Sequence, residues 1–281
     1  MTHAEHWTKL VTRILAPNAG PMTLDGTNAL VVRAPGAAAA VIVDPGPDDD
    51  AHLAALQAQG PVELIILTHH HHDHTESAAR FAAMTGAPVR AFDPRLCIDS
   101  PPLEDGEVII AGGTRIEVVT TPGHTADSVS LFLPEDAEVP GTSGRGDGAA
   151  PASLSNGSMI TGDTILGRGT TIIAHPDGSL GRYLASLDRL AAYGDLTVLP
   201  AHGDVLPSLA EVCRTYAGHR RVRLGQVRDV LAVRELEPSG DAAVVAAVVD
   251  DVYGNVDPAI RFAAEASVRA QLEYLAAGPL A

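Results

Sequence analysis

The most constraining feature of the sequence is a tract of five histidines and one aspartate at residues 69–74, directly after the apolar run at 63–68. A short apolar run rich in isoleucine and leucine predicts a buried strand. The segment at 75–86, "TESAARFAAMTG", predicts a helix with Thr75 as its N-cap and Gly86 as its end. We therefore expect the tract to be fixed from both sides, at the end of a strand where binding sites are commonly built.

Strand-like and helix-like segments alternate between residues 28 and 205, which predicts an α/β (α+β) architecture. The expected strands are 29–33, 40–44, 63–68, 114–120, 128–133, 158–163 and 196–203, and the next expected helix is 179–192. Only helices are expected afterwards, at 208–218, 219–234, 240–253 and 258–276. These patterns predict a mixed domain at 1–207 and a small helical domain at 208–281. The Gly, Ser, Ala and Pro-rich segment 140–158 is expected to be a flexible surface insertion.

The overall charge and hydropathy limit the classes of partner. The formal net charge of −16 disfavours indiscriminate binding to polyanions. Six arginines in residues 214–234 indicate either a solvated helix face or a local polyanion-facing surface. The chain contains no apolar stretch long enough to span a membrane and no recognisable export signal, so we expect a cytoplasmic protein without a membrane partner.

The histidine tract is expected to divide its side chains between two metal ions. Alternate residues of an extended segment point in opposite directions, so His69 and His71 are expected to face one ion, while His70 and His72 point away. The next two residues, Asp73 and His74, stand at the start of the predicted helix and are expected to face a second ion.

Three further residues of ligand type lie after predicted strands: His124 in "TTPGHTADS", Asp163 at the end of "SMITGD", and His202 after "LTVLP". Imidazole and carboxylate ligands without thiolate suit zinc, with manganese or iron as alternatives. Three histidines on one zinc ion leave a position for water, whose pKa falls to about 7. Asp163 is the natural bridge between two ions about 3.5 to 4 Å apart. Such a centre predicts a hydrolase.

The motif "THHHHDH" at 68–74, followed in order by "PGH", "TGD" and "PAHG", resembles the metallo-β-lactamase superfamily over about residues 22 to 206. The resemblance implies a four-layer αβ/βα sandwich with a dinuclear site that holds two Zn²⁺ ions at its edge. It implies that Asp163 bridges the metals and that the other ligands are His69, His71 and His124 at the first metal and Asp73, His74 and His202 at the second.

The resemblance also implies roles beyond the direct metal ligands. Asp44, in "IVDPGP", and Thr68 are expected to support the ligands from behind. Asp73 and His202 are expected to act in catalysis together with a metal-bound hydroxide. Ser128, Thr125 and Arg168 lie beside ligand positions and are candidates for substrate contacts, with turn capping as the alternative role. His175, after "TTIIA", is a candidate acid or substrate contact at the rim of the site, with an ordinary surface position as the alternative.

Within the superfamily, "PMTLDGTNALVV", "PGHTADSVSL", "GDTILGRGTT" and the helical tail resemble the beta-lactamase-like protein 2 branch. That branch implies a single-strand-preferring endoribonuclease with a winged-helix-like C-terminal domain, so hydrolysis of single-stranded RNA is the first expectation. The alternatives are a thioesterase resembling hydroxyacylglutathione hydrolase, a β-lactamase-type amide hydrolase, and a non-catalytic metal-binding scaffold. The native metal, the substrate, nucleic-acid binding by the tail, and the choice between a homodimer and internal packing of the Ala-rich helices stay open.

Overall fold

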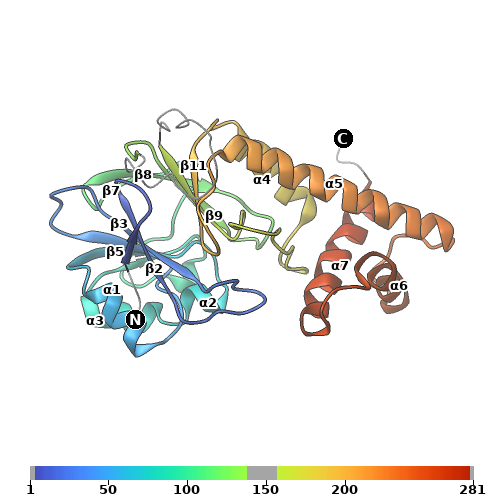
Figure 1. The fold of residues 1–281 in the computed structure, drawn as a ribbon, viewed down its shortest axis with the longest axis horizontal. Helices are drawn as coiled ribbons and strands as arrows, with labels where there is room; N and C mark the ends of the chain where they lie inside the picture. Colours follow the sequence, from blue (N-terminus) through green and yellow to red (C-terminus); the bar gives the residue numbers. More distant parts are fainter. Residues whose placement is uncertain (1–3, 138–156, 279–281) are drawn as a thin grey trace, which may run out of the picture.

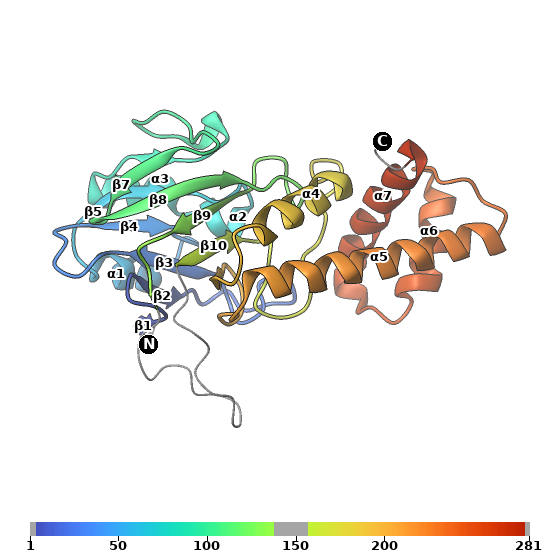
Figure 2. The same ribbon diagram turned by 90° about the horizontal axis from the view of Figure 1, so that it is seen from above.

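The structure is a computed structural model, and it describes residues 4–137 and 157–278. Two β-sheets pack face to face, and helices cover the outer face of each sheet (Figure 1, Figure 2). The prediction of a layered α/β sandwich is therefore confirmed. The predicted insertion at 140–158 lies outside the described residues, except for Gly157 and Ser158.

The first sheet has six strands in the order β1-β2-β3-β4-β5-β6, and β4, β5 and β6 run parallel to one another. The strands are β1 (Ala4–His6), β2 (Val11–Leu15), β3 (Asn28–Val32), β4 (Ala40–Val43), β5 (Val62–Ile66) and β6 (Val89–Arg90). Helices α1 (Asp50–Gln57) and α3 (Ala78–Thr85) cover its outer face, where Ile42 and Ile65 share a core with Leu53 and Phe81.

The second sheet has five strands in the order β11-β10-β9-β8-β7, and β10 runs parallel to β11. The strands are β7 (Val108–Ala111), β8 (Thr114–Thr120), β9 (Val129–Leu133), β10 (Ser158–Gly162) and β11 (Thr197–Pro200). In β8, Ile116 and Val118 belong to the core between the sheets, whereas Val119 packs with Leu187 of helix α4 (Leu180–Ala191). This division follows the two-residue alternation of a strand.

The C-terminal segment is entirely helical in the described part of the chain. It consists of α5 (Leu209–Val233), α6 (Ala242–Tyr253), the short 3-10 helix η2 (Pro258–Ile260) and α7 (Arg261–Ala277). The predicted break between 218 and 219 is wrong, because α5 continues through Gly218, where the helix surface is open. No strand follows β11 within residues 4–137 and 157–278, so the expected winged-helix character has no support from the described residues.

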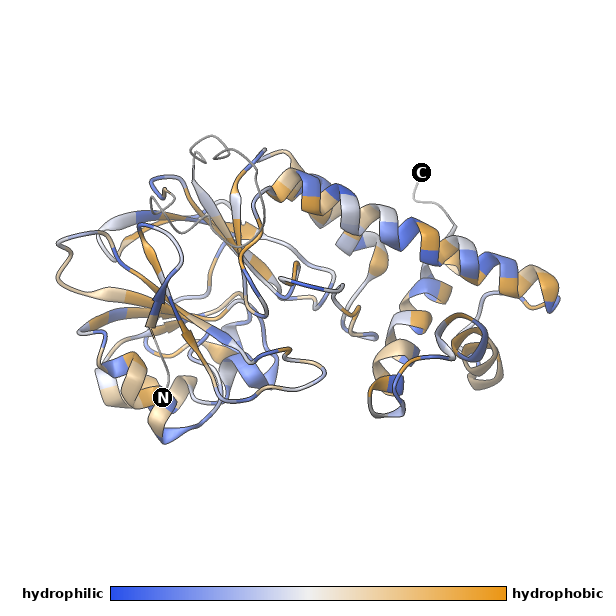
Figure 3. Cartoon of the chain, viewed as in Figure 1, coloured by the Kyte–Doolittle hydropathy of each residue, from blue (hydrophilic) through white to orange (hydrophobic). Residues whose placement is uncertain are grey.

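Helix α5 takes part in two cores. Its first half packs on the second sheet through Leu209 and Cys213, and its second half packs on α6 and α7 through Val227 and Leu231. Hydrophobic and hydrophilic residues alternate around α5 along its whole length, as such a double role requires (Figure 3). In the described residues after β11 the only regular elements are helices, which begin next to the predicted boundary at 207/208, and α5 packs both on the sandwich and on α6 and α7. No described helix is long and apolar enough to cross a lipid bilayer.

The predicted helix at 75–86 is shorter in the structure, and a separate short helix precedes it. Helix α2 (His72–Thr75) is followed by α3, and Ser77 precedes α3, so Thr75 is not the N-cap but the last residue of α2. Ser77 donates both its backbone N–H and its hydroxyl to the carbonyl of Gly46, at 3.2 and 2.9 Å, which fixes the break. Gly86 ends α3 with a left-handed φ of 74°, as predicted. The short α2 is what orients Asp73 and His74.

Candidate metal centre

The candidate ligands come from the carboxyl ends of four strands in two sheets. His69 follows β5, His124 follows β8, Asp163 follows β10 and His202 follows β11. Because these ends lie at one edge of the sandwich, side chains up to 133 positions apart meet in one place. The structure thus brings together all seven residues that the sequence predicted as ligands.

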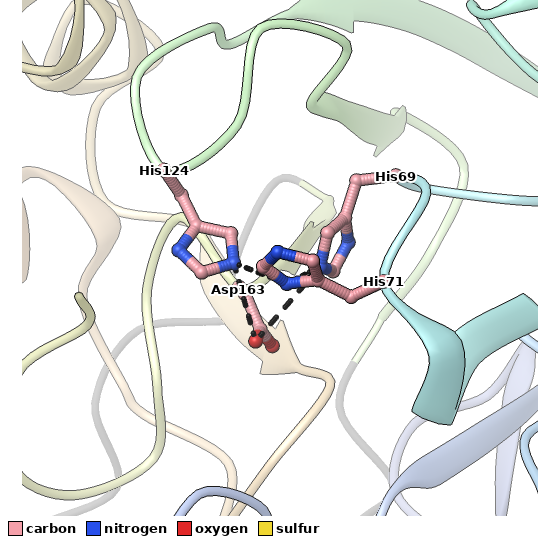
Figure 4. A group of neighbouring side chains, drawn as sticks. All are labelled: His69, His71, His124 and Asp163. Atoms are coloured by element: carbon pink, nitrogen blue, oxygen red, sulfur yellow. Dashed lines mark hydrogen bonds and ion pairs between the residues drawn. The ribbon is translucent and has the colours of Figure 1, made fainter. Parts of the chain in front are cut away.

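The first donor set consists of His69, His71, His124 and Asp163, and their donor atoms lie within 4.8 Å of one another (Figure 4). Nδ1 of His71 is 3.1 Å from Nε2 of His69 and 3.0 Å from Nε2 of His124. Asp163 Oδ2 lies 3.6 Å from His124 Nε2 and 4.0 Å from His69 Nε2. Three ring nitrogens and one carboxylate oxygen therefore face a single point.

The second donor set consists of Asp73, His74 and His202. Asp73 Oδ2 is 3.2 Å from His74 Nε2 and 3.1 Å from His202 Nε2. Asp163 Oδ1 is 3.7 Å from His74 Nε2 and 3.3 Å from His202 Nε2. One oxygen of Asp163 therefore faces each donor set, which is the geometry of a bridging carboxylate.

The outward ring nitrogens of four of the histidines have fixed partners. Nδ1 of His124 donates to the carbonyl of Ile172 at 2.6 Å, and Nδ1 of His202 donates to the carbonyl of Gly26 at 3.1 Å. Such bonds fix the tautomer of an imidazole and leave the inner nitrogen with its lone pair. Sequence analysis missed these acceptors, because a backbone carbonyl has no residue signature.

Asp44 holds the other two histidines together. Its carboxylate accepts hydrogen bonds from the N–H of Thr68 at 2.8 Å, from the Thr68 hydroxyl at 2.7 Å and from Nδ1 of His74 at 2.9 Å. The Thr68 hydroxyl oxygen lies 3.1 Å from Nδ1 of His69 and accepts a hydrogen bond from the N–H group there. The structure thus places Asp44 and Thr68 behind one histidine of each donor set.

Two glycines allow the ligand loops to approach their supports. Gly162, with φ of 49°, precedes Asp163, and a β-carbon there would lie 2.8 Å from the Thr68 hydroxyl. Gly123, with φ of 148°, precedes His124, and a β-carbon there would lie 2.3 Å from the α-carbon of Tyr183. A larger residue at either position would push a ligand out of place.

The donor atoms of the centre fit a pair of cations. His74 Nε2 and Asp163 Oδ1 are buried and have no hydrogen-bond partner among the described residues. Nε2 of His69 and Nε2 of His124 each have a free lone pair, since the Nδ1 atoms of these rings carry the protons. Buried polar atoms such as His74 Nε2 and Asp163 Oδ1 are unfavourable when they lack a hydrogen bond, and a cation between them would satisfy both.

Burial and neighbouring charges set the protonation of the site. Burial lowers the pKa of His71 to about 4, with a smaller contribution from the neighbouring ring of His124. Burial also lowers the pKa of His69 well below its usual value. Burial alone would raise the pKa of Asp163, but His202 and His74 hold it well below its usual value. The first donor set is therefore neutral in its imidazoles and ionised in its carboxylate, as metal binding requires.

The second donor set holds protons that a cation would displace. Burial disfavours charge on His202, but the carboxylates of Asp163 and Asp73 outweigh it and raise the pKa of His202 to about 10. Burial also disfavours charge on His74, but the carboxylates of Asp73 and Asp44 outweigh it and raise the pKa of His74 well above its usual value. A metal ion bound here would take over the role of these protons.

The two remaining histidines of the tract point away from the centre, as expected. His70 Nδ1 lies 2.8 Å from Asp127 Oδ1, and this pair, with Asp177 nearby, ties the histidine tract to the loop that carries His124. His72 is 81 % exposed in its side chain and pairs with Glu76.

The predicted substrate contacts have different locations. His175 lines the cavity beside the metal centre, and its Nε2 lies 3.4 Å from a carboxylate oxygen of Glu273 in α7. Ser128 and Thr125 are buried and bond to each other within their loop at 2.6 Å. Arg168 pairs with Asp25 and lines a different surface depression. Of these residues only His175 is positioned to meet a substrate at the centre.

Two threonines near the ligands were not predicted. The Thr27 hydroxyl donates to Asp73 Oδ2 at 3.2 Å, and the Thr171 hydroxyl lies 3.2 Å from Nδ1 of His124. Thr27 stands in "DGTNALVV", directly before β3, so its position at a strand end offered a weak signal. Thr171 lies in a segment without regular structure and offered none.

A cavity of about 330 Å³ opens onto the metal centre. His71, Asp73, His124 and Asp163 form its floor. The walls are mostly apolar and come from three separate segments, through Met22, Ile172, Ala174, Phe262, Ala263 and Ala266. Helix α7 of the C-terminal segment thus supplies one wall of the site.

Two paired donor sets at the edge of a four-layer sandwich define the protein as a metal-dependent hydrolase with a dinuclear type of centre. The sequence profile described as the Metallo-beta-lactamase superfamily matches residues 22–137. The chain is 30% identical over 253 residues to "Lactamase-like protein vrtG" of Penicillium aethiopicum, covering 88% of this chain and 74% of the relative. The chain belongs to the metallo-β-lactamase superfamily.

Two further similarities extend over nearly the whole chain. The "Beta-lactamase-like protein 2 homolog" of Caenorhabditis elegans is 28% identical over 291 residues, covering 98% of this chain and 88% of the relative. The crystal structure of a beta-lactamase domain protein from Burkholderia ambifaria has a TM-score of 0.74 at 20% identity, covering 99% of this chain and 89% of that chain. The similarity to that solved structure includes the helical C-terminal part.

Proposed function

We propose that the protein hydrolyses an ester or thioester of a small substrate with an apolar acyl group. The observation that carries the proposal is the cavity of about 330 Å³ beside the two donor sets, whose walls are mostly apolar. Its size lies within the usual range for small-molecule sites. Among the described residues no arginine or lysine lines it, whereas binding to a nucleic-acid backbone depends on such cations.

The chain's own residues determine what a bound metal pair would do. We propose that His69, His71 and His124 hold one Zn²⁺ ion, that Asp73, His74 and His202 hold the other, and that Asp163 joins them; Mn²⁺ or Fe would suit the same ligands. When bound, the pair supplies an acidified water molecule and polarises the scissile carbonyl. The apolar walls orient the acyl group and exclude bulk water from the carbonyl carbon. His175 is placed to contact the polar end of the substrate.

The test compares thioesters of N-acetylcysteamine whose acyl chains lengthen from acetyl to octanoyl. We expect kcat/KM to rise with chain length, since each buried methylene contributes about 0.8 kcal/mol. Phe262→Ala and Met22→Ala are expected to reduce the preference for octanoyl over acetyl by about tenfold, with little change for acetyl. Phe92→Ala is the matched control, because Phe92 is also exposed but does not line the cavity. Equal kcat/KM for all chain lengths would contradict an acyl-binding role.

Hydrolysis of single-stranded RNA is the second candidate function. Two points support it: the motif resemblance to the beta-lactamase-like protein 2 branch, which implies an endoribonuclease and agrees with the similarity over 98% of the chain, and three exposed arginines seven residues apart on α5. Arg214, Arg221 and Arg228 lie on one face of the helix and have no ion pair among the described residues. Their spacing suits a surface that tracks phosphates.

The two candidates are separated by one assay. The zinc-loaded protein is offered octanoyl-N-acetylcysteamine, S-lactoylglutathione and a short unstructured RNA. Cleavage of RNA alone would overturn the first proposal, and simultaneous replacement of Arg214, Arg221 and Arg228 by glutamine would then lower RNA cleavage and leave metal content unchanged. Metal binding without hydrolysis of any of these substrates would instead indicate a scaffold.

A further inference from the structure

Arg220 is an unusual residue for its location. Its side chain belongs to the buried face of α5, where the residue is only 3 % exposed. Among the described residues it forms no ion pair with a carboxylate, its hydrogen bond goes to a backbone carbonyl, and its Nε is buried without a hydrogen bond. A buried guanidinium without a counter-charge is costly, and an aliphatic side chain would fill the same space without that cost. The guanidinium therefore requires a specific reason.

The contacts of Arg220 lead to the metal centre. One terminal nitrogen donates to the backbone carbonyl of Thr171. The guanidinium carbon also lies 5.2 Å from the ring centre of Tyr183 in α4. Because α4 and α5 both pack on the second sheet, the guanidinium is held between fixed elements and in turn holds the segment at Thr171.

That segment orients a metal ligand. The Thr171 hydroxyl and the carbonyl of the next residue, Ile172, lie 3.2 and 2.6 Å from Nδ1 of His124. Residues 170–174 form neither helix nor strand, so the backbone there depends on such contacts for its position. The same segment lines the cavity through Ile172 and Ala174.

We propose that Arg220 is a positioning residue for His124. Its bond to Thr171 fixes residues 171 and 172, which hold Nδ1 of His124 and keep Nε2 aimed at the first donor set. Arg220 thereby connects α5 to the metal centre, in addition to the wall that α7 supplies. The proposal rests on the metal centre and not on which ester, thioester or RNA is the substrate.

The experiment measures zinc binding to the full chain by chelator competition, together with the visible spectrum of the cobalt(II)-loaded protein. We expect Arg220→Met to weaken the site of His69, His71 and His124 by about 10- to 100-fold, as replacement of residues that orient metal ligands commonly does. The site of Asp73, His74 and His202 should keep its affinity, and the cobalt spectrum should change. Arg220→Lys, which can still donate to the carbonyl, should restore most of the affinity and the native spectrum.

Two further variants separate positioning from general stability. Arg223→Met is the matched control, because Arg223 lies on the same helix and stacks on Tyr253, with 4.9 Å between its guanidinium and the ring centre, without contact to Thr171. Arg220→Gln retains a polar side chain too short to reach the carbonyl, and it decides the question if Arg220→Met does not fold. Native affinity and spectrum in a folded Gln or Met variant would overturn the proposal. Equal weakening of both sites, or a Lys variant no better than Gln, would also overturn it.

Discussion

Replacement of Asp44 by asparagine tests whether the metal centre is held from behind as the structure indicates. Asp44 is only 2 % exposed, and its carboxylate accepts three hydrogen bonds, two from Thr68 and one from His74. Asparagine has one acceptor and one donor group, so its NH₂ group would face N–H or O–H groups that also donate. With two bonds lost at about 1.5 kcal/mol each, the free energy of unfolding should fall by about 3 kcal/mol.

The variant should also weaken metal binding at one site more than at the other. His74 loses the acceptor that fixes its tautomer, so the affinity of the second donor set should fall by about 10- to 100-fold. Zinc titration against a chromophoric chelator gives the affinities, and urea unfolding of the metal-free protein gives the stability. The affinity loss should be smaller at the first donor set, because His69 is linked to Asp44 only through the Thr68 hydroxyl.

Asp136→Asn is the matched control for Asp44→Asn. Asp136 is also a buried carboxylate, and it accepts from the Thr8 hydroxyl at 2.6 Å, from the N–H of Leu10 at 3.0 Å and from the Ser158 hydroxyl at 2.5 Å. Because Ser158 begins β10 and Asp163 follows its end, this network lies at the opposite end of that strand from the metals. The control should lose stability and keep both metal affinities. If Asp44→Asn lost stability but kept native zinc affinity, the reasoning would be refuted.

Two further predictions concern backbone space and pH. Gly123→Ala should destabilise the protein by more than about 2 kcal/mol, because the new methyl group would meet the backbone of Tyr183. Gly218→Ala, on the open face of α5, should instead stabilise the protein by about 0.5 to 1 kcal/mol. Urea unfolding curves of the two variants measure both effects, and equal effects would contradict the close approach of Gly123 to Tyr183. In the metal-free protein, His71, with a folded pKa of about 4 against a usual 6.5, binds fewer protons folded than unfolded, so the free energy of unfolding should rise by roughly 3 kcal/mol between pH 4 and 6.5. His202, with a folded pKa of about 10, binds more protons folded, so stability should fall again between pH 6.5 and 10. Unfolding curves across this range should show a maximum near pH 6.5, and a steady trend in one direction would count against the protonation states described here.

The sequence alone determined the layered fold and the residues able to bind metal. Two-residue alternation and short β-branched runs predict seven of the eleven described strands, because these patterns follow from burying a pleated surface. The strands β1, β2, β6 and β7 were not predicted. His69, His124, Asp163 and His202 were recognisable because metal chemistry needs particular side chains and because each follows a strand. These properties are local, so they can be read along the chain.

Tertiary structure decided the details that depend on distant partners. The break between α2 and α3 depends on the carbonyl of Gly46, and the tautomer of His202 depends on a carbonyl 176 residues away. The hydrogen-bond acceptor of the buried Arg220 side chain is the carbonyl of Thr171, 49 residues away. One wall of the cavity comes from α7, far from every ligand in sequence. Backbone carbonyls and apolar walls are made of groups that nearly every residue carries, so no sequence pattern marks them. Only the packing of α4, α5 and α7 against the sandwich selects which of them face the metals.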